Sequence, residues 1–356
     1  MQHQSNPKVT VLMTVYNGLP YLKHAIESTL NQTFTDYEFL IIDDTSTDDS
    51  INCILSYIDP RIILIKNEVN IGQTASLNRG LAIAKGEYIA RLDQDDVNLP
   101  SRLEGQLEMF IKNPQLSIVC SWEHTIDSEG RLVRDWRKEI RDYGVFLGEI
   151  LLGLCPVWHP SVMFKKEVIQ NLGGYDKSYG PAEDYELWSR IAIAGLNAGI
   201  VSEFHLLQRV HGNRQSYLQA TKQIESTRRA HIKVIKNLLI SPYAECTAAI
   251  LRLEKDPCGQ KYTKSHLLEI SSHFSLMLKR IKENYTLSEK EYNSLKVTIS
   301  RRAGNGIFYA KKLEYLPDPL FFFSFYFLSP FLSTRLRFFV SSIIELLHRM
   351  RYFYKI

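Results

Sequence analysis

The sequence predicts an α/β protein with a mostly parallel sheet flanked by helices and a helical extension towards its C-terminus. Three observations support this prediction. Short apolar runs alternate with segments of helical spacing over the first 120 residues, two of these runs end in aspartate clusters, and long amphipathic segments follow residue 212. Because crossovers between parallel strands are right-handed, the strands of such a sheet all end at one rim.

The predicted elements of the first 120 residues follow one another closely. The run 9–16 (VTVLMTVY) is β-branched and nearly continuous, as in a strand that is buried on both faces. Leu22, Ala25, Ile26 and Leu30 then recur at helical spacing. The same reasoning predicts further strands at 38–42, 62–65 and 88–92 and helices at 47–57 and 73–84.

The pattern changes twice further along the chain. Residues 116–211 combine short strand candidates at 117–122, 161–164 and 206–211 with a helix at 184–194. Beyond them, amphipathic helices are predicted at 219–239, 243–253, 266–281 and 288–301. We therefore divide the chain into a first domain at 1–215, a helical region of unknown role at 216–319, and a tail at 320–356.

The tail differs from the rest in charge and aromatic content. The formal net charge of the chain is +4, and the tail alone holds five Lys and Arg residues against one Glu. The other 319 residues are thus formally neutral, which argues against nucleic acid as a partner. Aromatic rings beside cations are typical of a segment on an anionic membrane surface; a hydrophobic helix packed on the helical region or on a second subunit is the alternative. The longest uncharged run, 320–334, is shorter than the roughly 20 apolar residues that span a bilayer.

Two further features indicate a cytoplasmic compartment. The five cysteines lack CxxC spacing, which predicts reduced thiols rather than disulfides or a zinc site. Cys155 and His159 lie four apart but have no further ligands nearby in the sequence. Residues 1–8 are polar and lack the apolar run of a signal peptide.

Aspartates follow two of the predicted strands. Asp43 and Asp44 end one apolar run, and the segment 93–96 (DQDD) ends another. Ligands of parallel α/β sheets bind beyond the carboxyl ends of the strands, so we expect both clusters at one site. Carboxylates packed together without Lys or Arg partners require a cation, and Asp-x-Asp oxygens suit Mg²⁺ or Mn²⁺. Asp also caps helices and makes turns, which is the interpretation we prefer for Asp48 and Asp49.

At these residues the sequence resembles the family 2 glycosyltransferases, which have the GT-A fold. The matching stretches occur in the family's order over about the first 215 residues: 9–18 (VTVLMTVYNG), 30–50 (LNQTFTDYEFLIIDDTSTDDS), 70–80 (NIGQTASLNRG), 85–103 (KGEYIARLDQDDVNLPSRL), 159–166 (HPSVMFKK), 172–190 (LGGYDKSYGPAEDYELWSR) and 209–213 (RVHGN). The resemblance implies an enzyme that takes a sugar from a nucleotide-diphosphate donor, uses a divalent metal, and inverts the anomeric carbon.

The resemblance also implies which residues bind the nucleotide sugar. Asp44 matches the position that accepts the uracil N3–H, and family habit favours a UDP-sugar over thymidine or guanosine donors. In this sequence Leu77 stands where the family often has Arg, and Arg79, two places later, stays open between a donor contact and a surface residue. The implied donor-binding set is Val15, Tyr16, Asn17, Asp43, Asp44, Asn70, Gly72, Asn78, Asp93 and Gln94.

The remaining implied roles concern the metal and the acceptor. Asp95, Asp93 and His211 are the expected ligands of Mn²⁺ or Mg²⁺, although a His at a strand end is also a common structural residue. Asp184 is the expected general base beside Glu183, with a helix cap as the alternative interpretation. The acceptor side is expected to include His159, Gly174, Tyr175 and Trp188, and Trp188 has a core position as its alternative.

Other functions fit the sequence less well. A nucleotidyltransferase would carry a Gly-rich basic loop after the first strand, and a dinucleotide-dependent oxidoreductase would carry G-x-G-x-x-G, but this chain has TVYNGLPYLK there. A catalytically degenerate, membrane-associated glycosyltransferase-like scaffold is the non-enzyme alternative. By resemblance, we expect an acceptor hydroxyl on a glycan or lipid-linked glycan, in bacterial polysaccharide or lipopolysaccharide synthesis on the cytoplasmic face of the inner membrane.

Overall fold

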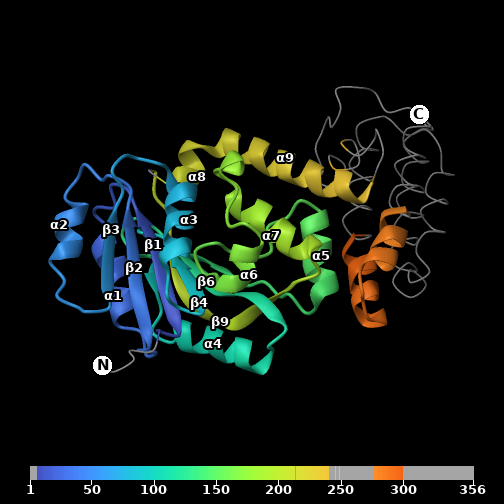
Figure 1. The fold of residues 1–356 in the computed structure, drawn as a ribbon, viewed down its shortest axis with the longest axis horizontal. Helices are drawn as coiled ribbons and strands as arrows, with labels where there is room; N and C mark the ends of the chain where they lie inside the picture. The colour runs from blue at the N-terminus through green and yellow to red at the C-terminus, as the bar shows by residue number, and fades with distance from the viewer. Residues whose placement is uncertain (1–5, 213, 240–244, 246–247, 249–275, 300–356) are drawn as a thin grey trace, which may run out of the picture.

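A computed structural model describes residues 6–212, 214–239, 245, 248 and 276–299. Its centre is a mixed sheet in the strand order β3-β2-β1-β4-β8-β6-β9-β5, with β7 paired to β6 (Figure 1). The strands are β1 (Val9–Val15), β2 (Tyr37–Asp43), β3 (Ile62–Lys66), β4 (Tyr88–Leu92), β5 (Val97–Asn98), β6 (Leu116–Ile126), β7 (Leu132–Trp136), β8 (Met163–Lys165) and β9 (Asn197–Arg209).

The first four strands confirm the predicted parallel arrangement. β1 lies between β2 and β4 and pairs with both in parallel, and β3 pairs in parallel with β2. The rest of the sheet is mixed, because β8 is antiparallel to both of its neighbours, β4 and β6. β9 continues the sheet in parallel with β6 and, at 13 residues, is about twice as long as the six-residue signal LLQRVH at its end.

Side-chain alternation along the central strands builds two cores, one on each face of the sheet. In β1, Val9, Val11, Met13 and Val15 pack into one cluster and Leu12 into the other. The described helices divide in the same way, which makes a three-layer α/β/α architecture. One face is covered by α1 (Leu22–Leu30), α2 (Ser50–Leu55) and α4 (Arg102–Lys112), and the other by α3 (Gln73–Ile83), α5 (Tyr143–Leu151), α6 (Lys166–Asn171), α7 (Glu183–Ile193) and α9 (Ala220–Leu238).

The helix α9 shares its core with the first domain. Ala230, Val234, Ile235 and Leu238 belong to the same apolar cluster as Trp188 of α7, and α9 lies alongside α7 in Figure 1. The predicted domain boundary at 215 therefore does not coincide with a boundary of the hydrophobic core. The short helix α8 (Gln215–Leu218) precedes α9.

Residues 276–284 and 289–299 are also helical, within the predicted helices at 266–281 and 288–301. The second segment approaches α5 at two glycines: a Cβ on Gly144 would lie 1.9 Å from the Glu291 carbonyl oxygen, and one on Gly148 would lie 2.9 Å from the Thr298 side chain. Among the described residues, no helix is both long and apolar enough to cross a membrane. The predicted helix at 243–253, apart from residues 245 and 248, and the tail at 320–356 lie outside the described residues.

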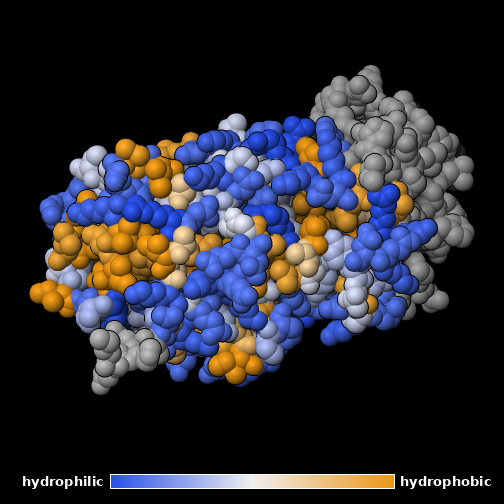
Figure 2. Space-filling model, in the orientation of Figure 1, coloured by the Kyte–Doolittle hydropathy of each residue, from blue (hydrophilic) through white to orange (hydrophobic). Residues whose placement is uncertain are grey.

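The surface is polar over most of the face shown in Figure 2, with apolar side chains gathered over β2 and β3. Ile63 and Ile65 of β3 are only partly buried there, because β3 is the edge strand of the sheet. The carboxyl ends of the parallel strands form one rim of the sheet. The polar residues of the predicted site come directly after these strand ends.

Candidate active site

The ends of β1 and β2 form a network of polar side chains. The amide of Asp44 donates to the Val15 carbonyl (2.7 Å), so the two strands stay paired beyond their last residues. The Asp44 carboxylate is 3% exposed and accepts from Asn67 Nδ2 (2.6 Å) and from the amides of Ile71 (2.9 Å) and Gly72 (2.8 Å). Asp44 thereby holds the loop between β3 and α3 at the rim.

Neighbouring residues of this rim are arranged by the same kind of bond. Asp43 is buried and accepts from the amides of Thr45 and Ser46 at 3.2 Å each, and Asn70 donates to the Asp44 carbonyl (3.1 Å). Asn17 Oδ1 accepts from the amides of Thr47 (2.8 Å) and Asp48 (3.3 Å). These hydrogen bonds join protein groups to one another, and the Tyr16 side chain at this rim is 48% exposed.

Gln94 lies against the backbone of Tyr16. Its Oε1 accepts from the Tyr16 amide (2.8 Å) and its Nε2 donates to the Tyr16 carbonyl (3.1 Å), so it ties the end of β4 to the end of β1. Asp48 accepts from the backbone amides of Leu19 (3.2 Å) and Ser50 (3.1 Å), which agrees with the structural role preferred for it. Arg79 is exposed and donates to the carbonyl of Lys66 at the end of β3 (3.0 Å).

The acid triad, which we define as Asp93, Asp95 and Asp96, follows β4. One carboxylate oxygen from each lies within 4.8 Å of the others. Asp95 Oδ2 is 2.8 Å from His211 Nε2, so the segments that follow β4 and β9 meet at the triad. Asp96 is fully buried; its Oδ1 accepts from the Arg209 amide (2.8 Å) and its Oδ2 has no hydrogen-bond partner among the described residues.

Arginines surround the triad, and the expectation that it lacks basic partners is wrong. Arg91 of β4 forms an ion pair with Asp93, and Arg209 Nε donates to the Asp95 carbonyl (3.2 Å). Arg214 lies within electrostatic range of all three triad carboxylates. Sequence spacing did not reveal these contacts, because Arg209, at the end of β9, and Arg214, just beyond it, follow Asp96 by 113 or more residues.

The pKa values of Asp95 and Asp96 shift in opposite directions. Burial works to raise the pKa of Asp95, but the bond from His211 and the charge of Arg214 outweigh it and lower the pKa. Burial, with the charges of Asp95 and Asp93, raises the pKa of Asp96 well above its ordinary value. Three carboxylates, one of them with a buried oxygen that has no partner among the described residues, supply the hard oxygen donors that Mg²⁺ and Mn²⁺ prefer, so the residues fit a divalent ion.

A second acidic pair begins the helix α7. Burial raises the pKa of Glu183 to about 7, and its Oε2 has no hydrogen-bond partner in the described part of the chain. Burial also raises the pKa of Asp184, whose Oδ1 accepts from the Tyr185 amide (2.7 Å) and whose Oδ2 lies 3.9 Å from Cys155 Sγ. A partly buried carboxylate with few neutralising partners has the basicity that proton abstraction requires.

Arg91 links the two acidic groups. This side chain is 2% exposed, and its Nε and Nη1 have no hydrogen-bond partner among the residues that the structure describes. Its positive charge acts on Asp93 and Asp96 of the triad and also on Glu183 and Asp184. The triad and the start of α7 therefore face one buried cation.

The predicted acceptor-side residues are mostly buried. His159 Nε2 lies 3.0 Å from the Tyr175 hydroxyl, and both side chains are less than 9% exposed. Burial lowers the pKa of His159 well below its ordinary value and raises that of Tyr175. Gly174 has φ +73°, and a Cβ there would lie 2.6 Å from Asn78 Oδ1, so this position requires glycine.

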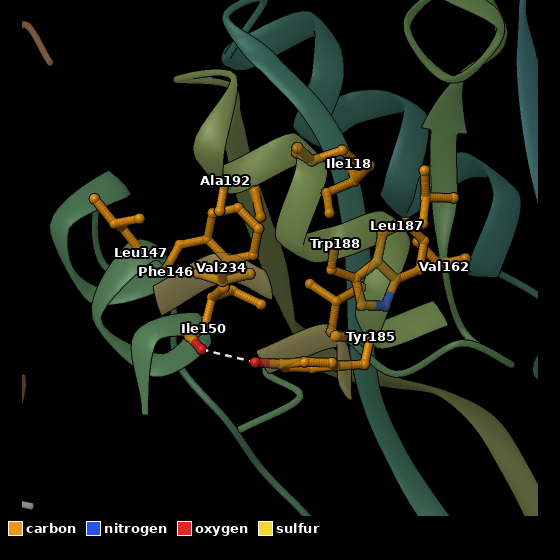
Figure 3. Packing of buried hydrophobic residues seen from close by; sticks show 14 of the residues in the cluster. Ile118, Phe146, Leu147, Ile150, Val162, Tyr185, Leu187, Trp188, Ala192 and Val234 are labelled. Atoms are coloured by element: carbon orange, nitrogen blue, oxygen red, sulfur yellow. Dashed lines mark hydrogen bonds between the residues drawn. The ribbon is translucent and has the colours of Figure 1, made fainter. Parts of the chain in front are cut away.

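Trp188 does not lie on the acceptor side, and that prediction is corrected. The indole is fully buried in the apolar cluster between the sheet and α5, as Figure 3 shows with Val162 and Leu187 beside it. The neighbouring Tyr185 donates from its hydroxyl to the Ile150 carbonyl (2.9 Å). Trp188 is thus a core residue with no face for a sugar ring.

Sequence reasoning missed Arg91, Glu123 and Arg214, and it placed Asp96 in the acidic cluster without assigning it a role. Burial raises the pKa of Glu123 to about 7, and this carboxylate of β6 is within range of Arg214 and Asp93. An arginine inside the apolar run YIARL was the available signal for Arg91, because an unpaired guanidinium is rarely placed in a buried strand. Glu123 and Arg214 do not interrupt a comparable apolar run, so no such signal marks them in the sequence.

Comparison with known proteins agrees with this geometry. The model of glycosyl transferase family 2 matches residues 10–173. An uncharacterized glycosyltransferase of Methanocaldococcus jannaschii is 37% identical over 227 residues, which are 61% of this chain and 75% of that protein. The fold and site define a glycosyltransferase with the GT-A fold. The chain belongs to glycosyltransferase family 2.

Solved structures share the fold at low sequence identity. S. aureus TarS, crystallised with UDP-GlcNAc, superposes with a TM-score of 0.53 at 15% identity and covers 83% of this chain and 80% of its own. The mannosyltransferase PcManGT of Pyrobaculum calidifontis, in complex with GDP-Man and Mn²⁺, gives a TM-score of 0.51 at 16% identity, over 85% and 88% of the two chains. These similarities concern the fold alone.

Proposed function

We propose that this protein is an inverting glycosyltransferase that transfers a sugar from a nucleotide-diphosphate sugar, with UDP favoured, to a hydroxyl of a glycan or lipid-linked glycan. The main observation behind the proposal is that the acid triad and the start of α7 lie around the same buried Arg91. A direct displacement needs a metal-binding group for the leaving diphosphate and a basic carboxylate for the acceptor hydroxyl.

In the proposed reaction Asp184 is the general base. The acceptor hydroxyl attacks the anomeric carbon, the bond from that carbon to the diphosphate oxygen breaks, and the hydroxyl proton passes to the Asp184 carboxylate. Burial raises the pKa of Asp184, which brings it closer to neutral pH and makes the carboxylate a better proton acceptor. Glu183, whose Oε2 lacks a bond among the described residues, would bind the acceptor beside it.

The donor is proposed to lie between the rim of β1 and β2 and the triad. Exposed Tyr16 would pack against the base and Asp44 would position it through the loop at 70–72. Asp95, Asp93 and His211 would hold Mn²⁺ or Mg²⁺, which when bound supplies positive charge opposite the departing diphosphate. Arg91 and Arg214 add fixed positive charge on the same side of the sheet.

The test is a panel of UDP-, GDP- and dTDP-sugars screened for Mn²⁺-dependent release of nucleoside diphosphate. We expect one donor class to be hydrolysed slowly without acceptor and turned over faster with a glycan acceptor. Asp184→Asn should keep nucleotide binding and lose about 10²–10⁴-fold in transfer, the contribution typical of a general base. Asp36→Asn is the matched control, because Asp36 precedes the amino end of β2, opposite the site. Full transfer by Asp184→Asn would exclude this residue as the base.

Membrane association through residues 320–356 is the second part of the proposal and rests on their aromatic and basic composition. Sedimentation of the full chain with phosphatidylglycerol vesicles, compared with a chain ending at residue 319, tests it directly. We expect the full chain to sediment at low salt and the shorter chain to stay in the supernatant. Equal sedimentation of the two would rule the tail out as the anchor.

A further inference from the structure

Four side chains beside the proposed site form a group that the reaction above does not use. The rings of Trp136, in β7, and Trp158, in the loop before β8, have their centroids 5.1 Å apart at 52°. Each ring has a cation over it: Arg134 Cζ is 4.1 Å from the Trp136 centroid, and Lys138 Nζ is 5.1 Å from the Trp158 centroid. We call Arg134, Trp136, Lys138 and Trp158 the aromatic–cation platform.

Strand register places the platform on the same side of the sheet as the acid triad. β7 pairs with β6 so that Trp136 is opposite Glu123 and Arg134 is opposite Thr125. Side chains of directly opposed residues project from the same face of a sheet. The buried carboxylate of Glu123 is within electrostatic range of Asp93 on one side and of Arg134 and Lys138 on the other.

Two short contacts connect the platform to the proposed base. Lys138 Nζ donates to the Cys155 carbonyl (2.8 Å), and Cys155 Sγ lies 3.9 Å from Asp184 Oδ2. Trp158 follows Cys155 by three residues in the same loop. The platform is therefore connected to Asp184 through Cys155, and Glu123 lies within electrostatic range of both the platform and Asp93.

Arg134 is exposed, and the Lys138 ammonium keeps donor capacity beyond its bond to the Cys155 carbonyl. Within the described residues no carboxylate forms an ion pair with Arg134 or Lys138, and Trp136 Nε1 is buried without a hydrogen-bond partner. Arg137, one residue past Trp136, differs from Arg134 in its charge partner and in the aromatic rings that it contacts. It pairs with Asp135 (3.1 Å) and lies over Trp122 and Phe204 instead.

We propose that the aromatic–cation platform is an acceptor subsite for a sugar unit that carries a carboxylate or a phosphate. The apolar C–H face of the ring would pack on the indoles, which offer large rigid apolar surfaces with a polar N–H at the edge. Arg134 and Lys138 would bind the anionic group through charge-assisted hydrogen bonds, which are about twice as strong as neutral ones. The inference rests on the proposed function, since it names the acceptor class of that site.

The test compares three probes that differ in charge: methyl β-glucoside, methyl β-glucuronide and glucose 1-phosphate. Binding to the full chain is measured by ligand-observed NMR with saturating UDP and Mn²⁺, so that the donor site is occupied. We expect at least one charged probe to bind fivefold or more tightly than the neutral one. The carboxylate and phosphate probes distinguish a uronate-containing acceptor from a glycosyl phosphate.

Arg134→Ala is expected to remove the preference for the charged probe and to leave the neutral probe unchanged. Arg137→Ala, on the same strand, is the matched control and should bind all three probes as the unaltered chain does. Trp136→Ala should weaken the binding of all three probes. If that variant fails to fold, Trp136→Phe, which keeps an aromatic ring, replaces it and should weaken binding in the same direction. Equal binding of charged and neutral probes, or a preference that survives Arg134→Ala, would overturn the subsite.

Nucleotide binding separates this result from the proposed function. If UDP and GDP with Mn²⁺ leave the melting temperature unchanged, the donor assignment fails. The glucuronide comparison between Arg134→Ala and Arg137→Ala still decides the subsite in that case, because this probe carries no phosphate. If nucleotides bind and the charge preference is absent, the subsite fails while the donor site stands.

Discussion

Asn78 of α3 holds the backbone of Tyr175 with both ends of its amide. Nδ2 donates to the Tyr175 carbonyl and Oδ1 accepts from the Tyr175 amide, each at 2.8 Å. The two residues are 97 apart in sequence. This pair fixes the turn at Gly174 against the helix that follows the donor-side loop, so it joins the two halves of the proposed site. The resemblance placed Asn78 against the nucleoside, whereas its observed bonds are to the protein backbone.

Replacing Asn78 should destabilise the fold through that turn. Asn78→Ala leaves a buried amide and a carbonyl without partners, at about 1–3 kcal/mol for each unsatisfied group. We expect a loss of about 2–4 kcal/mol in the free energy of unfolding in urea, and a comparable loss for Asn78→Asp, which cannot donate. Asn31→Ala, at an exposed helix end, should change stability by less than about 0.5 kcal/mol. Equal stabilities of Asn78→Ala and Asn31→Ala would show that the hydrogen bonds between Asn78 and Tyr175 do not stabilise the fold.

Divalent metal should stabilise the protein through the acid triad. A ligand present at 100 times its dissociation constant adds about 2.7 kcal/mol to stability. We expect Mn²⁺ to raise the melting temperature of the unaltered chain, with little or no rise for Asp95→Asn. Asp49→Asn, at an exposed position after β2, should respond to Mn²⁺ as the unaltered chain does. A full Mn²⁺ response in Asp95→Asn would remove Asp95 from the ligand set.

Glu183 should make stability depend on pH. Its pKa is raised by burial from 4.5 to about 7, so the folded state keeps the proton to higher pH than the unfolded chain does. Stability contributed by the neutral form is present below pH 4.5 and is lost as pH rises towards 7 and beyond. Glu183→Gln cannot ionise, so from pH 5 to pH 8 it should gain about 2.5 kcal/mol relative to the unaltered chain.

Chemical denaturation at the two pH values measures that difference. Glu167→Gln, at an exposed position of α6, is the control and should follow the unaltered chain across the range. A Glu183→Gln variant whose stability relative to the unaltered chain is the same at pH 5 and pH 8 would show that the carboxyl is not buried as described.

Trp188 should act on stability and not on acceptor binding. Removal of a fully buried indole by Trp188→Ala is expected to cost about 3–5 kcal/mol. Trp188→Phe retains most of the apolar volume, and we expect the KM for the acceptor to stay within about twofold of the unaltered value, since the ring touches no solvent. A large rise in acceptor KM without a change in melting temperature would restore Trp188 to the acceptor site.

The local elements of the first half could be predicted because their signals are local. The apolar runs of β1, β2 and β4 and the helical spacing of α1 and α3 match the observed elements within two residues at each end. The helix α5 has no polar face to reveal its period: its residues are buried almost all round, and Gly144 and Gly148 weaken a helix prediction. The antiparallel β8 was found as a strand, but its direction depends on its neighbours in the sheet.

The sequence by itself determined the family, the parallel strands and the positions of the acidic clusters, because short runs of adjacent residues are enough to identify each of them. Tertiary structure alone decided what surrounds those clusters. Arg91 pairs with Asp93 because a β-strand points alternate side chains to one face, whereas Arg209 and Arg214 reach the triad only after β9 has entered the sheet. Burial and charge pairing depend on contacts between distant segments, and it is these contacts that set the pKa of each carboxylate and make Trp188 a core residue.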